Sequence, residues 1–330
     1  MIFMKVLFAA PPYINLDKSA GGVFNEMKAR EKALRKVGVE VEYLNLEKSP
    51  EWSTIDICHL FMANEGSYAL GVKLKAKKRL IVSPIIDRAS NIIVLKSFLK
   101  ISKGIPYFYS NFERCYELCS IADGIMVRSD EEKGKVAKVF SINKNVEVIK
   151  IPFMYNNRNT KKKEEFVFFL GDISNPRKNL KRLISICEKT NTKLVVAGVK
   201  GEGTYGDDVI RLIKNSKNVD YVGKLSEYEK YDYMNRAKVF ALPSLIEGVG
   251  LSALEALEFG CNVVITKHGG VRDYFADDVL YVDPKDENDI GDAINKALNK
   301  DFTYKQNDDV TFEHVGKNML NYYMDVLKDG

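Results

Sequence analysis

Short apolar runs alternate with longer segments of helical period along most of the chain. In the first half the apolar runs are KVLFAA (5–10), VEVEYLNL (39–46), DICHLFM (56–62), RLIVSPII (79–86), ADGIMVRS (122–129) and VEVIKI (146–151). Helical stretches such as residues 22–37 and 130–140 lie between them. Near-continuous Val, Ile, Leu and Phe runs are typical of strands buried on both faces, as in a parallel sheet covered by helices. The first half therefore predicts a doubly wound α/β domain.

The pattern is interrupted at residues 153–165 (FMYNNRNTKKKEE), which are polar and carry three consecutive lysines. It begins again with FVFFLGD (166–172), KLVVAG (193–198), VDYVG (219–223), KVFALP (238–243), NVVIT (262–266) and VLYV (279–282). We interpret residues 153–165 as a linker between a domain at 1–152 and a second Rossmann-like domain at 166–314. We expect the last helical stretch, within 315–330, to pack back on the first domain, and the two domains to face each other across a cleft.

The composition is that of an ordinary globular protein, with 45% hydrophobic and 29% charged residues among 330. This length is about twice that of a usual domain, which agrees with two domains. No uninterrupted apolar run reaches the roughly 18 residues that a membrane-spanning helix needs. Five cysteines lie singly inside apolar segments, so we expect buried thiols in a reducing cytoplasm.

The positive charge is concentrated in the first half. Residues 1–150 contain 24 Lys and Arg against 17 Asp and Glu, whereas residues 151–330 contain 26 against 28. Residues 69–103 hold nine of the basic side chains and one acid, Asp87. A solvated face explains this run, and so does a surface that meets anionic lipid or a phosphorylated acceptor. In the second case, residues 69–112 would touch the inner face of the membrane. Nucleic acid is not expected, because no recognition motif accompanies the charge.

A basic turn follows the first strand of the second half. In GDISNPRKN, Gly171 allows a tight exit from the strand, and Arg177 and Lys178 come where the helix NLKRLISICEK begins. Cations at the carboxyl end of a strand can meet an anion above the sheet. Arg offers a fork of donors to a phosphate, and Lys offers a mobile point charge. Two exposed residues that open a helix would be the simpler interpretation if this turn stood alone.

A glycine turn between two carboxylates follows a later strand. In LPSLIEGVGLSALEALEFG, Gly248 and Gly250 lie between Glu247 and Glu255, and a helix begins in the same stretch. Glycines let backbone N–H groups approach a ligand, and a helix N-terminus attracts an anion. Carboxylates readily accept hydrogen bonds from ribose or sugar hydroxyls. Together these features indicate a nucleotide-sugar site. The alternative is an exposed Glu247 and a Glu255 that interacts with the helix N-terminus.

The longer stretch LPSLIEGVGLSALEALEFGCNVVITKHGG resembles the donor-binding signature of the retaining GT-B glycosyltransferases of family 4, the group 1 glycosyltransferases. The matching positions are Pro243, Ser244, Glu247, Gly248, Gly250, Glu255, Ala256, Gly260, Gly269 and Gly270. The resemblance implies the GT-B fold, with two Rossmann-like domains. It implies transfer of a sugar from a nucleotide-diphosphate sugar to an acceptor hydroxyl with retention of configuration, in glycan or surface polysaccharide synthesis. It also implies no metal site and no cofactor besides the donor substrate.

The resemblance further implies roles for single residues. Arg177 and Lys178 would hold the donor diphosphate, and Glu247 would contact the transferred sugar and support charge at its anomeric carbon. Glu255 would bind the ribose hydroxyls. The rest of the donor site would consist of Gly171, Gly198, Lys224, Leu225, Gly248, Val249, Gly250 and Leu251, with Lys224 and Leu225 beside the base. An acceptor or phosphate turn in the first half would consist of Gly21, Gly22 and Asp87.

Some positions depart from the family pattern. Val249 stands where the family often has Phe, Asn262 where many members have Pro, and Ile86 where many have a histidine before the aspartate. We expect His59, in the middle of a strand, to be a core histidine. A degenerate protein that binds a nucleotide sugar or a partner without turnover is therefore the alternative to an enzyme. A dehydrogenase or epimerase is disfavoured, because no Gly-x-Gly-x-x-Gly follows the first strand.

Overall fold

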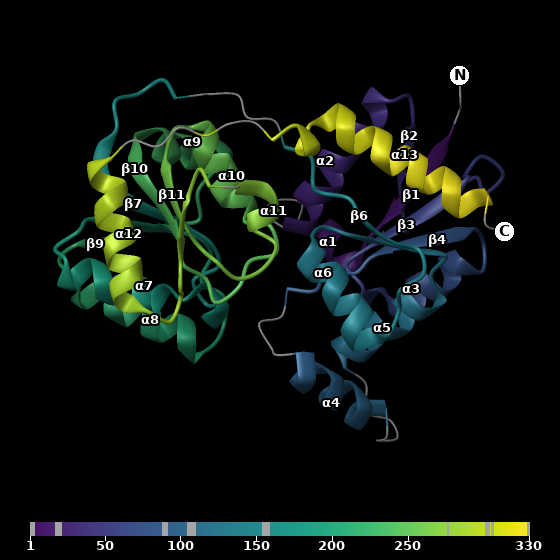
Figure 1. Ribbon diagram of the computed structural model, residues 1–330, viewed down its shortest axis with the longest axis horizontal. Coiled ribbons are helices and arrows are strands. Elements are labelled where there is room, and N and C mark those ends of the chain that lie inside the picture. Colours follow the sequence, from purple (N-terminus) through teal and green to yellow (C-terminus); the bar gives the residue numbers. More distant parts are fainter. Residues whose placement is uncertain are drawn as a thin grey trace. The chain divides into compact units, whose positions relative to one another are not determined.

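A computed structural model describes residues 4–16, 22–87, 92–103, 110–153, 159–275, 277–300, 304 and 307–328. The chain divides into two compact units (Figure 1): the first is Met1–Met154 with Asn307–Gly330, and the second is Tyr155–Gln306. Each unit contains one six-stranded sheet in which all strand pairs are parallel. Each of the twelve apolar runs overlaps one of these strands, so the expected α/β fold class is confirmed.

The sheet of the first unit has the strand order β2-β1-β3-β4-β5-β6. Its strands are β1 Lys5–Ala9, β2 Glu40–Tyr43, β3 Ile57–Phe61, β4 Arg79–Ser83, β5 Gly124–Val127 and β6 Val146–Val148. Alternate residues of β1 enter different cores: Leu7 and Ala9 pack into one, and Val6 and Phe8 into the other. The sheet is therefore buried on both faces, which explains why its strands show no polar alternation.

Helices cover both faces of this sheet. They are α1 Pro12–Leu16, α2 Gly22–Lys36, α3 Glu65–Lys75, α4 Ile92–Lys103, α5 Asn111–Ile121, α6 Asp130–Lys135, the π-helical turn Val136–Phe140, the 3-10 turn Asp308–Val310 and α13 Phe312–Lys328. Residues of α3, α4, α5 and the π-helical turn share one core, and residues of α2 and α13 share the other. The helical stretch expected at 130–140 is thus α6 followed by the π-helical turn.

The C-terminal helix α13 belongs to the first unit, where it lies beside α2 (Figure 1). The two helices approach closely at Gly316, where an added Cβ would lie 2.3 Å from the carbonyl oxygen of Ala33. Arg30 of α2 is fully buried next to this contact and donates to the carbonyl oxygen of Ile149 and to Glu26, both at 2.9 Å. Its charge is therefore compensated within the core.

The second unit has the strand order β12-β11-β10-β7-β8-β9. Its strands are β7 Glu164–Leu170, β8 Leu194–Ala197, β9 Val219–Gly223, β10 Ala237–Leu242, β11 Asn262–Thr266 and β12 Leu280–Val282. Its helices are the 3-10 turn Pro176–Lys178, α7 Leu180–Lys189, α8 Thr204–Asn215, α9 Glu227–Arg236, α10 Leu251–Glu258, α11 Arg272–Phe275 and α12 Glu287–Asn299. The order of the strands reverses between β7 and β10, which is where ligands bind in folds of this kind.

Two further predictions concern the cysteines and the absence of a membrane-spanning apolar run. All five cysteines are buried and unpaired, as expected. Burial raises the pKa of the Cys58, Cys187 and Cys261 thiols to about 12, so they are unreactive near neutral pH. Within the described part of the chain, no helix is both long and apolar enough to cross a membrane.

Candidate functional site

The three residues expected to be catalytic meet at the carboxyl edge of the second sheet. Arg177 and Lys178 lie in the loop after β7, and Glu247 lies in the loop after β10. Strands β7 and β10 are hydrogen-bonded neighbours in the middle of this sheet. The two loops therefore come from the point where the strand order reverses, and residues about 70 positions apart in the sequence are brought into contact.

Both cations contact the Glu247 carboxylate. Lys178 Nζ donates to Oε1 of Glu247 at 2.7 Å. Arg177 Nη1 lies 3.4 Å from Oε2 and donates to the carbonyl oxygen of Ile246 at 2.7 Å. The side chains of Arg177, Lys178 and Glu247 are 24%, 14% and 8% exposed. This cluster holds one more cation than anions and is poorly screened by water, so it can attract a further anion. An exposed Glu247, the alternative that the spacing left open, is excluded.

The loops after β7 and β10 are tied together by backbone and amide groups. The backbone N–H of Leu245 donates to the carbonyl oxygen of Arg177 at 2.8 Å. Asn179, at a left-handed φ of 58°, is buried and donates from Nδ2 to the carbonyl oxygens of Pro243 and Pro284 at 2.9 and 2.8 Å. Asn tolerates this backbone conformation better than most residues, which is the one local signal in the sequence. The role of Asn179 could not be predicted from the sequence, because its partners lie more than 60 residues away.

The backbone of Glu247 is held by the Gly-Gly turn after β11. Its N–H donates to the carbonyl oxygen of His268, and its carbonyl oxygen accepts from the N–H of Gly270, both at 3.1 Å. Gly269 lies between them with φ at 104°, and a Cβ there would lie 1.8 Å from the carbonyl oxygen of Glu247. Glycine is therefore required at this position. His268 is exposed at the same edge.

A second close contact brings the ends of β7, β8 and β9 together. The N–H of Gly198 donates to the carbonyl oxygen of Gly223 at 2.8 Å, and the N–H of Gly171 donates to that of Ala197 at 3.1 Å. Gly198 has a φ of 146°, and an added Cβ would lie 1.7 Å from the carbonyl oxygen of Gly171. The glycines expected to line the donor site thus pack against one another beneath the basic turn.

Glu255 lies in the second turn of α10 and pairs with Lys230, a residue that no sequence motif indicated. Lys230 of α9 places Nζ at 3.1 Å from Glu255 and at 3.0 Å from Glu227. Burial raises the pKa of the Glu255 carboxyl, and the nearby Lys230 offsets only part of this rise. Glu255 is half-buried and keeps some accessible surface. No local sequence pattern could reveal the pair, because it joins two separate helices, α9 and α10.

The remaining residues expected in the donor site lie in the loops after β9 and β10. Val249 is buried, so its side chain packs into the unit, and α10 begins at Leu251 directly after Gly250 (φ 80°). Gly248 is half-buried. After β9, Lys224 is exposed and Leu225 half-buried.

The residues expected to form an acceptor turn belong to the first unit. Gly21 lies outside the described residues, and Gly22 is the exposed first residue of α2. Asp87 accepts from Nη2 of Arg128 at 2.7 Å, and Arg128 also contacts the buried Glu132. Asp87 and Arg128 follow β4 and β5, so they lie at the carboxyl edge of the first sheet.

His59 is a core residue, as its position in the strand predicts. Nδ1 contacts the hydroxyl of Tyr323, and Nε2 contacts Oγ of Ser83, both at 2.8 Å. The ring is fully buried and stacks on Phe61. Burial lowers the pKa of His59 well below 6.5, so the imidazole is neutral in the folded protein.

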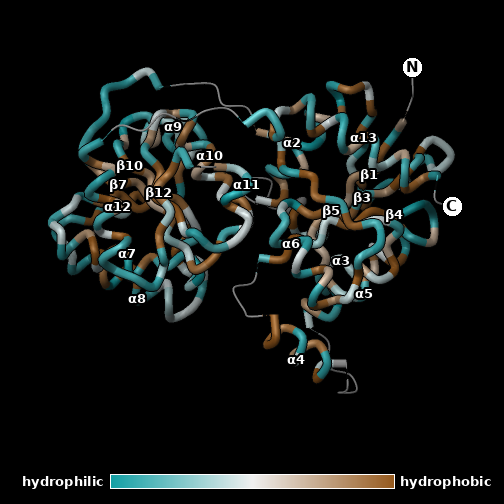
Figure 2. The backbone as a smooth tube through the Cα atoms, viewed as in Figure 1, coloured by the Kyte–Doolittle hydropathy of each residue, from teal (hydrophilic) through white to brown (hydrophobic). Residues whose placement is uncertain are grey.

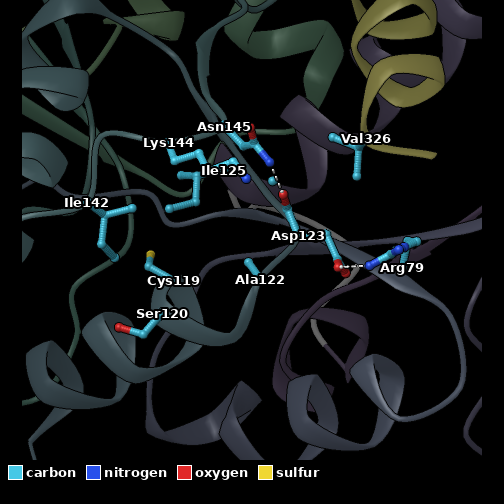
Figure 3. A pocket seen from close by; sticks show the side chains of 11 residues that line it. Arg79, Cys119, Ser120, Ala122, Asp123, Ile125, Ile142, Lys144, Asn145 and Val326 are labelled. Atoms are coloured by element: carbon cyan, nitrogen blue, oxygen red, sulfur yellow. Dashed lines mark hydrogen bonds and ion pairs between the residues drawn. The ribbon is translucent and has the colours of Figure 1, made fainter. Parts of the chain in front are cut away.

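A pocket of about 420 Å³ lies at the amino ends of β4, β5 and β6 in the first unit (Figure 3). Asp123 points into a basic environment there and accepts from Arg79 at 2.7 Å and from Lys75 at 2.6 Å. Sheets of this kind bind substrates at the opposite, carboxyl edge. The pocket shares no residue with the predicted donor site.

Similarity to solved structures identifies the fold of the chain. The chain resembles a sucrose-phosphate synthase from Thermosynechococcus elongatus, with a TM-score of 0.67 and 16% identity, over 98% of this chain and 95% of that one. It also resembles the catalytic domain of starch synthase IV from Arabidopsis thaliana bound to ADP and acarbose, with a TM-score of 0.70 and 12% identity, over 99% and 100% of the two chains. The chain has the GT-B fold.

The family follows from the second unit. Residues 152–311, just under half of the chain, match the family model of the glycosyl transferases group 1, so the second unit is a domain of this family. A curated relative is an N-acetylgalactosamine-N,N'-diacetylbacillosaminyl-diphospho-undecaprenol 4-alpha-N-acetylgalactosaminyltransferase from Campylobacter jejuni, which is 30% identical over 144 residues. The alignment covers 42% of this chain and 39% of the length of that relative.

Proposed function

We propose that the protein is a glycosyltransferase that moves a sugar from a nucleotide-diphosphate sugar to an acceptor hydroxyl with retention of the anomeric configuration. One observation carries the proposal: Arg177, Lys178 and Glu247 form a poorly hydrated cluster where the strand order of the second sheet reverses. The match of the second unit to the group 1 family model supports it.

In this proposal, Arg177 and Lys178 stabilise the leaving diphosphate as negative charge develops on it. Preorganised cations at the point of developing charge supply one of the largest contributions to catalysis. When the diphosphate binds, its oxygens compete with Glu247 for Lys178. The carboxylate can then turn to the hydroxyls of the transferred sugar and stabilise positive charge at the anomeric carbon. These two cations could take the place of a metal ion, so we propose that the reaction needs none.

The rest of the site would orient the donor. Glu255 would accept hydrogen bonds from the ribose hydroxyls, with its pair to Lys230 fixing the position of the carboxylate. Lys224 and Leu225 would lie beside the base. In a retaining reaction the incoming hydroxyl approaches the face that the diphosphate leaves. An oxygen of that diphosphate can then accept the proton of the acceptor, so no histidine is required for this step.

For the acceptor, we propose a glycan in polysaccharide or glycan synthesis, carried on a lipid diphosphate and bound by the first unit. The name of the Campylobacter relative, which describes a diphospho-undecaprenol-linked acceptor, supports this choice. So does the excess of basic residues in 69–112. The enzyme would then work in the cytoplasm, at the inner face of the membrane.

The test is to incubate the protein with several nucleotide sugars and candidate acceptors and to follow the release of free nucleoside diphosphate. We expect release that depends on the acceptor and that Glu247→Ala and Lys178→Ala both suppress. The anomeric configuration of the product, read by NMR, tests retention. Binding of nucleotide sugars without turnover for every acceptor would instead favour the degenerate protein.

A further inference from the structure

The surface of α4 (Ile92–Lys103) combines exposed aliphatic residues with lysines and carries no acid. Its sequence is IIVLKSFLKISK. Ile93, Val94 and Ile101 are 71%, 58% and 62% exposed, and they are three of the four most exposed aliphatic residues in the described part of the chain. Figure 2 shows hydrophobic and hydrophilic residues side by side on this helix.

The opposite face of α4 attaches the helix to the first unit. Leu95 and Leu99 are buried in the core that α4 shares with α5 and the π-helical turn Val136–Phe140. At 100° per residue these two leucines lie on one side of the helix, and Ile93, Ser97 and Lys100 lie on the other. Within the described part of the chain, the exposed aliphatic residues of α4 therefore do not pack into the core.

The outward face is itself divided into two halves. By helical spacing, Val94 and Ile101 lie on one side of Ile93, and Lys96 and Lys100 lie on the other. Lys96 and Lys100 are both exposed. An apolar half beside a cationic half is the arrangement of helices that lie in the plane of a lipid interface.

We propose that α4 docks the protein on an anionic lipid bilayer, with the three aliphatic side chains in the interface and the lysines against the lipid headgroups. This assigns the membrane contact of the proposed function to one helix and does not depend on the sugar transfer itself. The surface area that α4 offers is small, so binding is reversible and needs both the apolar and the electrostatic contribution.

Two other occupants fit the composition of this face less well. Protein interfaces are enriched in Arg, Tyr and Trp and depleted in Lys, whereas the exposed face of α4 holds Lys and none of those three. A symmetric contact between two copies would bring the lysines of one α4 against those of the other, which is unfavourable. Charge complementarity therefore favours an anionic surface.

Two of the basic residues before α4 belong to the fold of the first unit and not to this surface. Lys75 and Arg79 both contact Asp123 at the amino edge of the sheet, so part of their charge is compensated within the fold. Of the positive run at 69–103, these two cations therefore stabilise the first unit, whereas Lys96 and Lys100 of α4 face solvent.

The experiment is co-sedimentation with vesicles of phosphatidylcholine, alone or mixed with phosphatidylglycerol, in the absence of donor and acceptor. We expect binding to the mixed vesicles only, weakened by added salt. Lys96→Gln with Lys100→Gln should weaken it roughly 30-fold, or about fivefold for each lysine. Ile93→Ser with Ile101→Ser should also weaken it, whereas Leu212→Ser with Lys214→Gln, an exposed pair of the same kind on α8, should not.

Several results would overturn the proposal. One is no binding to the mixed vesicles, and another is binding that the α4 variants leave unchanged while each variant stays folded by circular dichroism. A self-association that the α4 variants abolish, without vesicle binding, would identify a second copy as the occupant. Because the assay contains no sugar donor, its failure leaves the proposed transfer untouched, and failure of the transfer assay leaves α4 docking untouched.

Discussion

Replacing Lys178 by Met removes one cation of the proposed diphosphate site and keeps the length of the side chain. In the structure, Nζ lies 2.7 Å from the buried Glu247 carboxylate and the side chain is 14% exposed, so water screens it little. A hydrogen bond to a charged group contributes about 1.5–3 kcal/mol. If Lys178 binds the diphosphate, Lys178→Met should raise the Kd of the nucleoside diphosphate about 10- to 150-fold.

The same change should affect turnover more than binding. Loss of a group that faces developing negative charge costs about 3–4 kcal/mol in the transition state, so kcat should fall by roughly 100- to 1000-fold. Calorimetric titration with the nucleoside diphosphate gives the Kd. Release of nucleoside diphosphate from the sugar donor gives kcat and KM. An increase in KM with kcat unchanged would mean that Lys178 binds the donor without stabilising the transition state.

Lys181→Met is the matched control, because Lys181 lies three residues further along the chain and pairs with Asp208 at 2.6 Å instead of Glu247. It should change Kd and kcat less than twofold or so, as expected for a surface pair. The proposed role of Lys178 is refuted if Lys178→Met behaves like this control while both variants unfold at the same urea concentration as the unchanged protein.

Three further predictions concern stability. Gly198→Ala should lower the free energy of unfolding by at least about 2 kcal/mol, because the new Cβ would meet a backbone carbonyl at a left-handed φ. Gly22→Ala is the control and should change the free energy of unfolding little, because the space around Gly22 is open. Similar urea midpoints for both variants would contradict this prediction. Burial alone would raise the pKa of Asp123, but hydrogen bonds from two cations and a backbone amide hold it below 3.8, so the carboxylate stabilises the fold above that pH and less as the pH falls through the folded pKa. Asp123→Asn should therefore cost about 1–3 kcal/mol at neutral pH and reduce the loss of stability in acid, and unchanged urea unfolding at neutral pH would count against it. The pKa of His59 in the folded protein lies well below 6.5, so below pH 6.5 the unfolded chain binds a proton at this residue that the folded chain does not. The contribution of His59 to the free energy of unfolding is therefore complete above pH 6.5 and falls by about 1.4 kcal/mol per pH unit below it. His59→Gln should remove this dependence of the free energy of unfolding on pH, and the exposed control His314→Gln should not. A pH dependence that survives in His59→Gln would show that other groups cause it.

The sequence predicted the strands well because burial on both faces of a parallel sheet leaves a continuous apolar run. It predicted their ends less well. The run VEVEYLNL continues to residue 46, whereas β2 ends at Tyr43, since hydrogen bonding to the neighbouring strand decides where a strand stops. The helical stretch at 130–140 gave no sign of its change to a π-helix at Val136.

The chemistry of the candidate site was visible in the sequence where it depends on local residue types. Arg177 and Lys178 next to a strand end, and two glycines between carboxylates, are local patterns. The pairs that fix these groups are not local. Asn179 holds the loop after β10, and Lys230 holds Glu255 across two helices, so both become recognisable only once the chain has folded.

The most direct test of the central claim is an experimental structure of the protein with a nucleoside diphosphate bound. A thermal-shift screen of UDP, GDP, ADP and CDP would select the ligand. We expect diphosphate oxygens within hydrogen-bonding distance of Arg177 and Lys178, and ribose hydroxyls on Glu255. A diphosphate bound elsewhere, such as in the pocket beside Asp123, with the cluster around Glu247 unchanged, would contradict the account.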